Sequence, residues 1–265
     1  MIQLEDDDVA KMKYIYGVAV IKKRFFRMLN PRLFFVAVGI FVSVTLGNST
    51  DLKNNTSEFP DPIELYGDKI AFDVFRGDER VGTQTVRFSR VGEDLIVNSR
   101  FEIKIDVLFF TVYRFLYQSD AIWRDGGLRE LNVEVDDNSE VFWLKAKEHS
   151  GVTDIRSTFS NASYEGNLYP TNHWNAHVLR ETRVLNTLTG LVNSVRIDAR
   201  NREVVQTERG NIVATRYSYT GDLETDVWYD DSGRWVKMRF NSRDGNKIDY
   251  VCRHCQGSQT VLMAK

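Results

Sequence analysis

The sequence predicts a mainly β protein, built as a large curved antiparallel sheet or open β-barrel of roughly a dozen strands. Apolar and polar residues alternate strictly in three segments, which is the pattern of strands with one buried face. Turn residues recur every 10 to 20 residues, so the strands are mostly long and antiparallel. Proline cannot donate to a strand ladder, and only Pro170 follows Pro62. One short helical insert, at about residues 171–189, interrupts the sheet.

The longest alternating segment covers residues 95–107. Its apolar face holds Leu95, Val97, Phe101, Ile103, Ile105 and Val107. Its polar face holds Asn98, Arg100, Glu102, Lys104 and Asp106. Residues 131–136 and 70–74 repeat the pattern, so each segment is expected to bury every second side chain.

Glycine, aspartate and asparagine separate the predicted strands, and these residues favour the tight turns of β-hairpins. The turn segments are Arg76–Asp78, Val91–Asp94, Asp125–Gly127, Asp136–Asn138, Asp231–Gly233 and Asp244–Asn246. The predicted strands therefore follow one another as hairpins.

The predicted helical insert follows Pro170 and ends before Gly190. The residues near helical spacing are Trp174, Val178, Leu185 and Leu188. Glycine is common directly after a helix, so Gly190 suits a helix end. We expect one short helix or two turns here, packed against or across the sheet.

An uncharged, apolar run of 14 residues, Leu33–Leu46, follows a cluster of basic residues. It is shorter than the roughly 20 residues of a membrane span, and it fits the apolar centre of a secretory signal. About 32 residues precede it, which is long for a signal, whereas translation from Met28 would leave a short one. The basic cluster also permits an uncleaved anchor with a cytoplasmic N-terminus. We expect an exported, periplasmic domain, held at the inner membrane if the signal is not cleaved.

These features divide the chain into four parts. Residues 1–47 form an N-terminal extension with the signal peptide or signal anchor, and the polar residues 48–62 form a flexible linker. Residues 63–256 are expected to fold as a single β domain, and residues 257–265 form a C-terminal tail. A content of 42% hydrophobic and 12% aromatic residues is enough to fill one core.

The charge of the chain argues against nucleic acid as a partner. The chain holds 35 basic and 37 acidic residues, and residues 48–265 hold 28 and 33 of them. A surface that follows phosphates needs clustered lysine and arginine, and no basic run occurs after the signal region.

Residues 107–117 depart from the alternation, because they are apolar or aromatic on both faces of a strand. This composition predicts a strand that is covered on both sides. Either the helical insert and the core of the sheet cover it, or one face lines a cavity for an apolar ligand.

The second alternative gives a set of candidate ligand-binding residues for an apolar groove. These residues are Phe109, Phe110, Tyr113, Arg114, Phe115 and Trp174. The aromatic residues of the strand would form the wall, and Trp174 on the insert would form a lid. Arg114 would contact an anionic head group, although such an arginine more often reaches the rim of a cavity or pairs with a carboxylate.

The two cysteines, Cys252 and Cys255, lie at the end of the last predicted strand. In an oxidising compartment an isolated pair favours a disulfide. In an extended strand their Cα atoms would be about 10 Å apart, so the chain must turn there if the bond forms. Free thiols, redox chemistry and metal binding are the alternatives.

Residues that could carry catalysis are sparse. His173 and His177 are four residues apart, which is the spacing of two zinc ligands on a helix, but Trp174 stands where the metalloprotease pattern needs glutamate. A third ligand is not evident either. The sequence contains no glycine-rich phosphate loop and no nucleophile-turn motif. We therefore predict no catalytic residues, no metal and no cofactor.

Several motifs of the chain resemble a family of exported Gram-negative bacterial proteins that is defined only as a domain of unknown function. The motifs are Phe72–Arg76 with Val81–Gln84, Val107–Arg114, Asn172–Asn175, Leu185–Gly190 and Val227–Phe240. The resemblance covers roughly residues 65–252. More remotely, the closing hairpin is similar to those of periplasmic proteins with a curved sheet around a hydrophobic cleft, including the LolA and LolB lipoprotein carriers.

The sequence therefore favours an exported, non-catalytic module that binds a lipid, an acyl chain or a lipidated partner such as a lipoprotein in an apolar groove. The alternatives are a hydrolase-type enzyme that uses His173 and His177, and an envelope scaffold without a small ligand. The identity of the ligand and the oligomeric state do not follow from the sequence.

Overall fold

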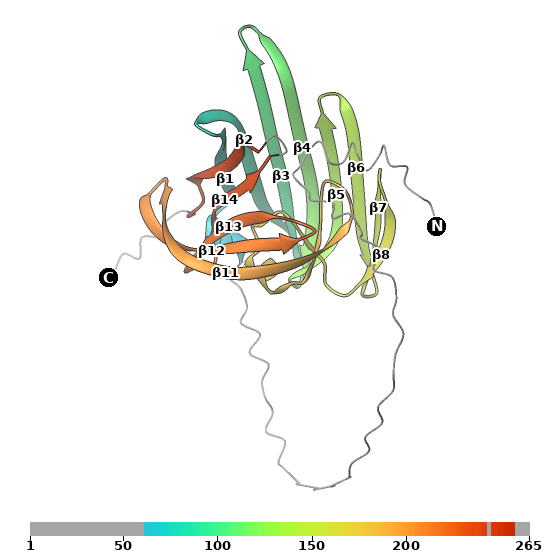
Figure 1. The fold of residues 1–265 in the computed structure, drawn as a ribbon. Coiled ribbons are helices and arrows are strands. Elements are labelled where there is room, and N and C mark those ends of the chain that lie inside the picture. The colour runs from blue at the N-terminus through green and yellow to red at the C-terminus, as the bar shows by residue number, and fades with distance from the viewer. Residues whose placement is uncertain (1–60, 243–244, 258–265) are drawn as a thin grey trace, which may run out of the picture. The chain divides into compact units, whose positions relative to one another are not determined.

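The computed structural model describes residues 61–242 and 245–257 (Figure 1). The predicted signal run Leu33–Leu46, the possible start at Met28, most of the predicted linker and residues 258–265 of the predicted tail lie outside the described residues. Within the described ranges, no helix has the length and apolar character that are needed to cross a bilayer.

The described chain consists mainly of strands. The first half holds β1 (Lys69–Arg76), β2 (Glu79–Val91), β3 (Asp94–Val107), β4 (Phe110–Arg124), β5 (Gly127–Asp137), β6 (Glu140–His149), β7 (Val152–Ser157) and β8 (Asn161–Glu165). The second half holds β9 (Tyr169–Pro170), β10 (Arg183–Leu185), β11 (Val192–Thr207), β12 (Gly210–Gly221), β13 (Thr225–Asp230), β14 (Trp235–Asn241) and β15 (Lys247–His254). The helical segments are α2 (Pro62–Tyr66) and the 3-10 helix η1 (Ala176–Arg180).

All strands belong to one open 15-stranded sheet, so the predicted fold class is confirmed. The order across the sheet is β8-β7-β6-β5-β4-β3-β2-β1-β15-β14-β13-β12-β11-β10-β9. Strands β1 to β8 follow one another outward from the centre. The chain then crosses to the far edge and returns strand by strand, until β15 pairs antiparallel with β1.

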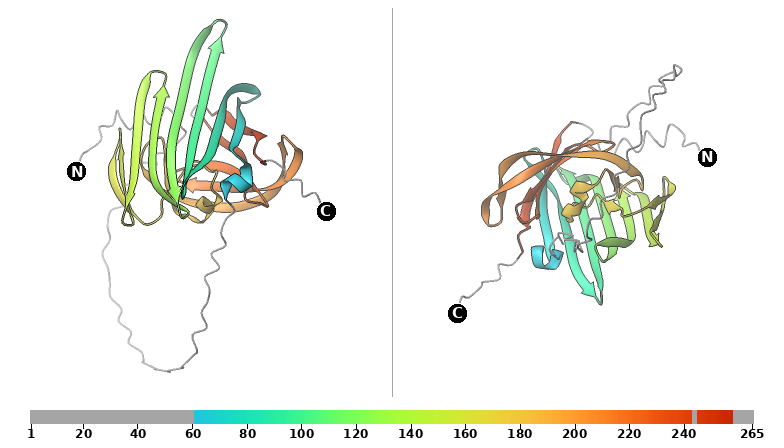
Figure 2. Two further views of the ribbon diagram at one scale, coloured as in Figure 1. Left: turned by 180° about the vertical axis from the view of Figure 1, so that it is seen from behind. Right: turned by 90° about the horizontal axis from the view of Figure 1, so that it is seen from below.

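The short connection between the two edge strands requires the sheet to curl. β8 ends at Glu165 and β9 begins at Tyr169, yet these strands are opposite edges of the sheet. Three linking residues reach at most about 14 Å, whereas the edges of a flat 15-stranded sheet would be about 65 Å apart. The sheet therefore bends back on itself, and the C-terminal strands lie across the N-terminal ones (Figure 2).

Side chains on the inner face of the curled sheet form the core, as the alternation predicts. In β3, Leu95, Val97 and Phe101 are buried, while Ile103 and Ile105 are partly buried and pack against the same core. The corresponding buried residues of β1 and β5 are Ile70, Phe72, Val74, Leu131, Val133 and Val135. The hydrophobic effect therefore selects the register of each strand, because a shift of one residue would expose the apolar set.

The predicted helical insert is mostly not helical. Its helical part is η1, and β10 follows with only two intervening residues. The insert ends in a turn in which the N–H of Gly190 donates to the carbonyl of Asn186. Gly190 has a φ of 73°, and a Cβ atom there would lie 2.5 Å from the Ser157 hydroxyl oxygen. Glycine is thus required at this position by both conformation and close packing.

The doubly apolar segment of residues 107–117 is not one strand. β3 ends at Val107, Leu108 and Phe109 form a two-residue turn, and β4 begins at Phe110. The first part of the segment is the tip of a hairpin, so its apolar residues do not lie on the two faces of a single strand. The expectation that both sides of this segment are covered is therefore incorrect at the tip, where Leu108 and Phe109 are 87% and 94% exposed.

A disulfide joins Cys252 and Cys255, with their Cα atoms 5.9 Å apart. The chain leaves the extended conformation of β15 between them, which brings the two residues within disulfide reach. The carboxylate of Glu208 accepts the backbone N–H groups of Cys255 and Gln256, at 3.0 and 3.1 Å. Glu208 therefore stabilises the turn that the disulfide closes.

Replacing both cysteines with serine should lower the free energy of unfolding by about 2 kcal/mol, because the unfolded chain would lose the cross-link of a short loop. Urea denaturation of the full-length protein, followed by circular dichroism, measures this change. Reductant should shift the midpoint of the wild-type protein in the same direction and leave that of the double variant unchanged. A double variant as stable as the oxidised wild type would contradict a stabilising role.

Candidate ligand-binding cavity

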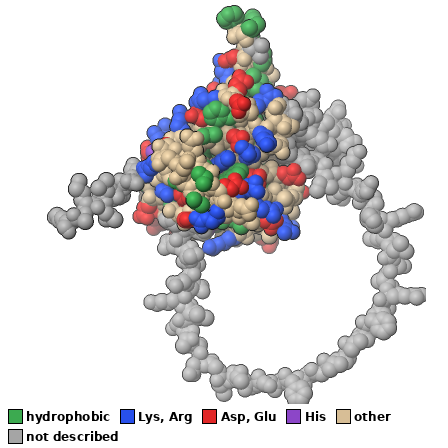
Figure 3. All heavy atoms as spheres, turned by 60° about the vertical axis from the view of Figure 1, so that its left-hand side comes forward, with side chains coloured by type: hydrophobic (Ala, Val, Ile, Leu, Met, Phe, Trp, Pro, Cys, Tyr) green, Lys and Arg blue, Asp and Glu red, His purple; other side chains and the backbone are tan. Residues whose placement is uncertain are grey.

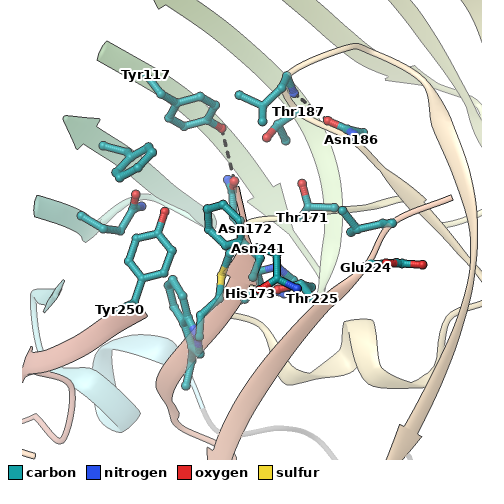
Figure 4. A pocket seen from close by; sticks show the side chains of 17 residues that line it. Tyr117, Thr171, Asn172, His173, Asn186, Thr187, Glu224, Thr225, Asn241 and Tyr250 are labelled. Atoms are coloured by element: carbon teal, nitrogen blue, oxygen red, sulfur yellow. Dashed lines mark hydrogen bonds between the residues drawn. The ribbon is translucent and has the colours of Figure 1, made fainter. Parts of the chain in front are cut away.

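A cavity of about 120 Å³ lies on the inner side of the curled sheet (Figure 4). Strands from both halves of the sheet, the insert and the segment between β12 and β13 supply its walls. The lining residues are Gln84, Phe101, Tyr117, Thr171, Asn172, His173, Asn186, Thr187, Leu188, Leu223, Glu224, Thr225, Trp235, Met238, Phe240, Asn241 and Tyr250. The cavity thus collects residues that lie far apart in the sequence.

Three neighbouring strands form one wall. Gln84 on β2 is the register partner of Phe101 on β3, which is in turn the partner of Tyr117 on β4. The three side chains therefore form a row across the sheet on its buried face. The register of these long strands fixes the positions of all three.

An aromatic cluster centred on Tyr250 joins this wall to the C-terminal strands. The ring centroid of Tyr250 lies 5.6 Å from that of Phe101, 6.1 Å from that of Trp235 and 6.2 Å from that of Phe240. Burial raises the pKa of the Tyr250 hydroxyl above its ordinary value. Rings at these separations attract one another and restrict one another's motion, so this part of the wall is well defined.

Two buried tyrosines hold the insert against the sheet. The Tyr229 hydroxyl on β13 donates to the carbonyl of His173 at 2.7 Å. The Tyr66 hydroxyl on α2 donates to the carbonyl of Trp174 at 2.9 Å and accepts the N–H of Trp235 on β14 at 2.8 Å. These bonds satisfy backbone groups that would otherwise be buried without partners, and they place His173 in the cavity wall.

His173 is a buried, neutral side chain with an unused polar atom. It is 4% exposed, and burial lowers the pKa of its imidazole from 6.5 to about 4. Its ring packs against Tyr219 and Trp235, with centroid distances of 5.4 and 5.9 Å. Its Nδ1 atom has no hydrogen-bond partner in the described structure. An unpaired buried polar atom is costly, so this nitrogen stands out among the polar atoms of the cavity wall.

Further polar groups of the insert line the cavity beside His173. The Tyr117 hydroxyl donates to the Asn172 side-chain oxygen at 3.2 Å, which connects β4 to the insert. Asn186 and Thr187 are both 4% exposed, and the Asn186 side-chain oxygen accepts the N–H of Leu188 at 3.0 Å. One side of the cavity is therefore apolar and aromatic, and the other presents amide and hydroxyl groups.

The cavity carries little charge. Among its lining residues, Glu224 is the only carboxylate, and neither lysine nor arginine is present. Glu224 is exposed and precedes β13. An anionic ligand would find no cationic partner in this lining and would be repelled by Glu224.

The structure does not assemble the sequence-predicted groove. Phe109 and Phe110 are exposed on the β3–β4 hairpin, and Arg114 is exposed on the same hairpin. Tyr113 is half-buried there, and burial together with the nearby Asp137 carboxylate raises the pKa of its hydroxyl. Phe115 is 1% exposed and packs against Phe101, but it belongs to the core and not to the cavity lining.

Trp174 is not a lid. It is 5% exposed and packs against Phe88 and Trp123, with centroid distances of 5.5 and 5.2 Å. It therefore anchors the insert in the core, directly after the residue that lines the cavity. Its aromatic partners lie on strands that no pattern in the sequence connects to the insert.

The two histidines of the alternative, enzymatic hypothesis have different neighbours. The ring of His177 lies 6.2 Å from Tyr169 on β9, whereas His173 faces Tyr219 and Trp235. Burial lowers the pKa of His173, and among the described residues no carboxylate forms a hydrogen bond or ion pair with its ring. His173 contributes to the cavity, and His177 does not line it.

One group of three potential metal ligands occurs among the described residues, and it does not fit a metal. Atoms of Glu208, Cys252 and Cys255 lie within 4.8 Å of one another. Both sulfur atoms are bonded in the disulfide, whereas a metal ligand must be a thiolate. With the disulfide formed, Glu208, Cys252 and Cys255 stabilise the turn at the end of β15.

Comparison with known families decides the classification. A family model described as a domain of unknown function, DUF6134, matches residues 72–253. The chain belongs to the DUF6134 family. The matched range includes every residue that lines the cavity. No match was found among curated proteins.

A solved structure shares the fold of this DUF6134 protein. It is the crystal structure of a β-barrel-like protein of another domain of unknown function, DUF1849, from Brucella abortus. The TM-score is 0.52 at 12% sequence identity, and the similarity covers 72% of this chain and 98% of the other. At this identity the comparison supports the architecture and not a shared function.

Replacing Tyr229 with phenylalanine should lower the free energy of unfolding by about 1–3 kcal/mol, because the carbonyl of His173 would stay buried without a partner. Urea denaturation measures the change. Tyr217→Phe is the matched control: its ring packs 5.9 Å from that of Tyr229, but it is only half-buried. Equal losses in the two variants would show that the hydroxyl of Tyr229 has no special role.

His173 should make stability depend on pH. Its pKa is near 6.5 in the unfolded chain and about 4 in the fold, so the unfolded state binds more protons between these values. Stability should therefore be unaffected by His173 above pH 6.5 and should fall by up to about 3 kcal/mol as the pH drops to 4. Denaturation of wild type and His173→Asn at pH 7 and pH 4 isolates this difference. The exposed His149→Asn should behave like wild type, and equal pH dependence in all three proteins would contradict the assignment.

Proposed function

We propose that this DUF6134 protein is a non-catalytic binding module whose cavity holds the end of an acyl chain that belongs to a lipid or to a lipidated partner. The observation that carries the proposal is the cavity itself: an apolar and aromatic wall faces a side of amide, hydroxyl and imidazole groups, and one polar atom, His173 Nδ1, has no partner among the described residues. Ligand sites in proteins have this composition.

The size of the cavity limits what it can enclose. Its volume of about 120 Å³ is close to the roughly 150 Å³ of an engineered apolar cavity that binds benzene. A terminal segment of a chain or a single ring fits this space, whereas a whole lipid does not. The rest of the ligand would extend past the rim toward solvent or toward the partner that carries it.

The charge of the lining favours an uncharged group next to the cavity. Glu224 repels a carboxylate or phosphate, and no lysine or arginine offsets it. An ester, an amide or a hydroxyl could instead hydrogen-bond to the neutral His173. The sequence predicted that Arg114 contacts an anionic head group, but Arg114 lies on the exposed hairpin and outside the cavity lining.

We further propose that the domain acts in the periplasm, either free after signal cleavage or held at the inner membrane by the run Leu33–Leu46. The remote resemblance of its closing hairpin to the LolA and LolB lipoprotein carriers implies architecture more than activity. Fractionation of cells that express the full-length protein tests the location.

Filling the cavity tests the proposed ligand. Leu188→Trp and Met238→Trp each place a larger side chain in the lining, from the insert and from β14 respectively. Full-length wild-type protein should bind decanol, measured by isothermal titration calorimetry, and should bind decanoate more weakly at pH 7. Each filling variant should lose at least about 1.4 kcal/mol of binding free energy, which is a tenfold change in Kd.

The control is Val213→Trp on β12, which places the same side chain at an exposed position outside the lining. It should bind decanol like the wild type. The proposal is wrong if the wild-type protein binds no decanol, or if the control and the filling variants lose binding equally. Thermal unfolding of each variant shows whether a loss of binding comes from a loss of folding.

A further inference from the structure

The hairpin of β3 and β4 extends beyond the strands on either side of it (Figure 1). Pairing between β2 and β3 ends at Gly82 and Ile103, and pairing between β4 and β5 begins at Phe115. Residues 104–114 therefore form a two-stranded ribbon without strand neighbours. Four residues per strand beyond Ile103 correspond to about 14 Å of protrusion.

The end of this ribbon is apolar. Leu108, Phe109, Phe110 and Val112 are 87%, 94%, 72% and 53% exposed. Figure 3 shows apolar side chains gathered at the end of the protruding segment. Large apolar side chains in contact with water lower solubility, so such a cluster on a surface marks an interaction site.

The backbone conformation of the turn disfavours the residue found there, Leu108. Leu108 has a φ of 56°, in the left-handed region. Glycine, asparagine or aspartate normally occupies this place in a two-residue turn. Leucine at this position therefore works against local stability, and its exposed side chain gains nothing within the described fold.

Two cations face each other behind the apolar end. Lys104 on β3 and Arg114 on β4 are register partners, and like charges that face each other across a sheet destabilise it. Asp106 pairs with Lys104 at 2.9 Å, but Arg114 has no ion pair among the described residues. The ribbon thus has an apolar tip and, about 13 Å behind it, two cations, of which Arg114 has no ion pair among the described residues.

We propose that this hairpin docks onto the surface of a membrane with anionic lipids, inserting Leu108, Phe109 and Phe110 below the head groups. Interfacial protein segments bury apolar residues about 5–10 Å into this region. At that depth Lys104 and Arg114 would lie at the level of the phosphates and supply their charge.

Two features favour a bilayer over a protein pocket as the binding partner of the tip. The exposed apolar side chains form the end of the ribbon: Leu108 and Phe109 are the turn, and Phe110 and Val112 begin β4. A fluid bilayer closes around such a tip from all sides. In addition, only 14 residues separate the apolar run Leu33–Leu46 from the described domain, so an uncleaved run would keep the domain within about 50 Å of a membrane.

A dye at the tip tests docking in the full-length protein. Both native cysteines are in the disulfide, so Phe109→Cys provides a single free thiol for the polarity-sensitive dye NBD. With vesicles of phosphatidylcholine and phosphatidylglycerol in a 3:1 ratio, its emission should shift to the blue, and spin-labelled acyl chains should quench it. Glu93→Cys is the control, because its exposed turn lies at the opposite end of β3. Dye at residue 93 should stay in water even if the N-terminal run anchors the protein.

Two variants separate the contributions of the tip and the cations, with dye placed on Phe110→Cys. Leu108→Gly keeps the turn and relieves its backbone, so it should fold at least as stably as the parent while the vesicle concentration for half-maximal blue shift rises by about tenfold. Lys104→Gln with Arg114→Gln should raise that concentration on the mixed vesicles and not on pure phosphatidylcholine.

The inference fails if dye at residue 109 stays accessible to aqueous iodide in the presence of vesicles. It also fails if the blue shift appears without vesicles and grows with protein concentration, because the tip would then contact a second copy of the chain. Decanol binding to the cavity is measured without vesicles, so either proposal can fail while the other stands.

Discussion

The structure depends on the hydrogen bonds that hold the backbone of the insert inside the curled sheet. Tyr66 and Tyr229 reach His173 and Trp174 from α2 and β13, and Tyr66 also accepts a bond from β14. The insert follows the edge strand β9 and contains β10, so these bonds hold this edge of the sheet against α2, β13 and β14. It also supplies the polar side of the cavity. Two buried hydroxyl groups thus tie one edge of the curled sheet to its interior and hold the polar side of the site in place.

Burial explains why the cavity suits an uncharged group. His173 is kept neutral by desolvation, and the buried tyrosines around it keep their protons for the same reason. The charged side chains of the domain lie mostly on the outer face, where Asp94 and Arg124, or Asp249 and Arg239, pair across strands. The protein therefore separates two environments: an interior whose buried polar side chains are uncharged, and an outer surface of ion pairs that water and salt screen.

The strands were predictable because alternation reports directly which face of a strand is buried, as Leu95, Val97 and Phe101 show. The β3–β4 turn was not, because Leu108 and Phe109 carry none of the usual turn chemistry and read as more strand. The cavity could not be predicted from the sequence for another reason. Tyr117, Asn172 and Tyr250 meet only through the curling of the whole sheet, and no local pattern encodes that distance. The motifs Asn172–Asn175 and Leu185–Gly190 were visible, but their polar residues gave no sign of being buried.

The pairing of β1 with β15 at the centre of the sheet joins the two ends of the domain: Phe72 lies opposite Cys252. Most other strands pair with their neighbours in sequence and can form as soon as they are made. The central pair must wait for the last strand, and closing so long a loop is slow. Until then the inner faces of both half-sheets are open to water. A chain that reaches its compartment unfolded would therefore pass through a stage in which it needs protection from aggregation, whether or not it ever binds a ligand.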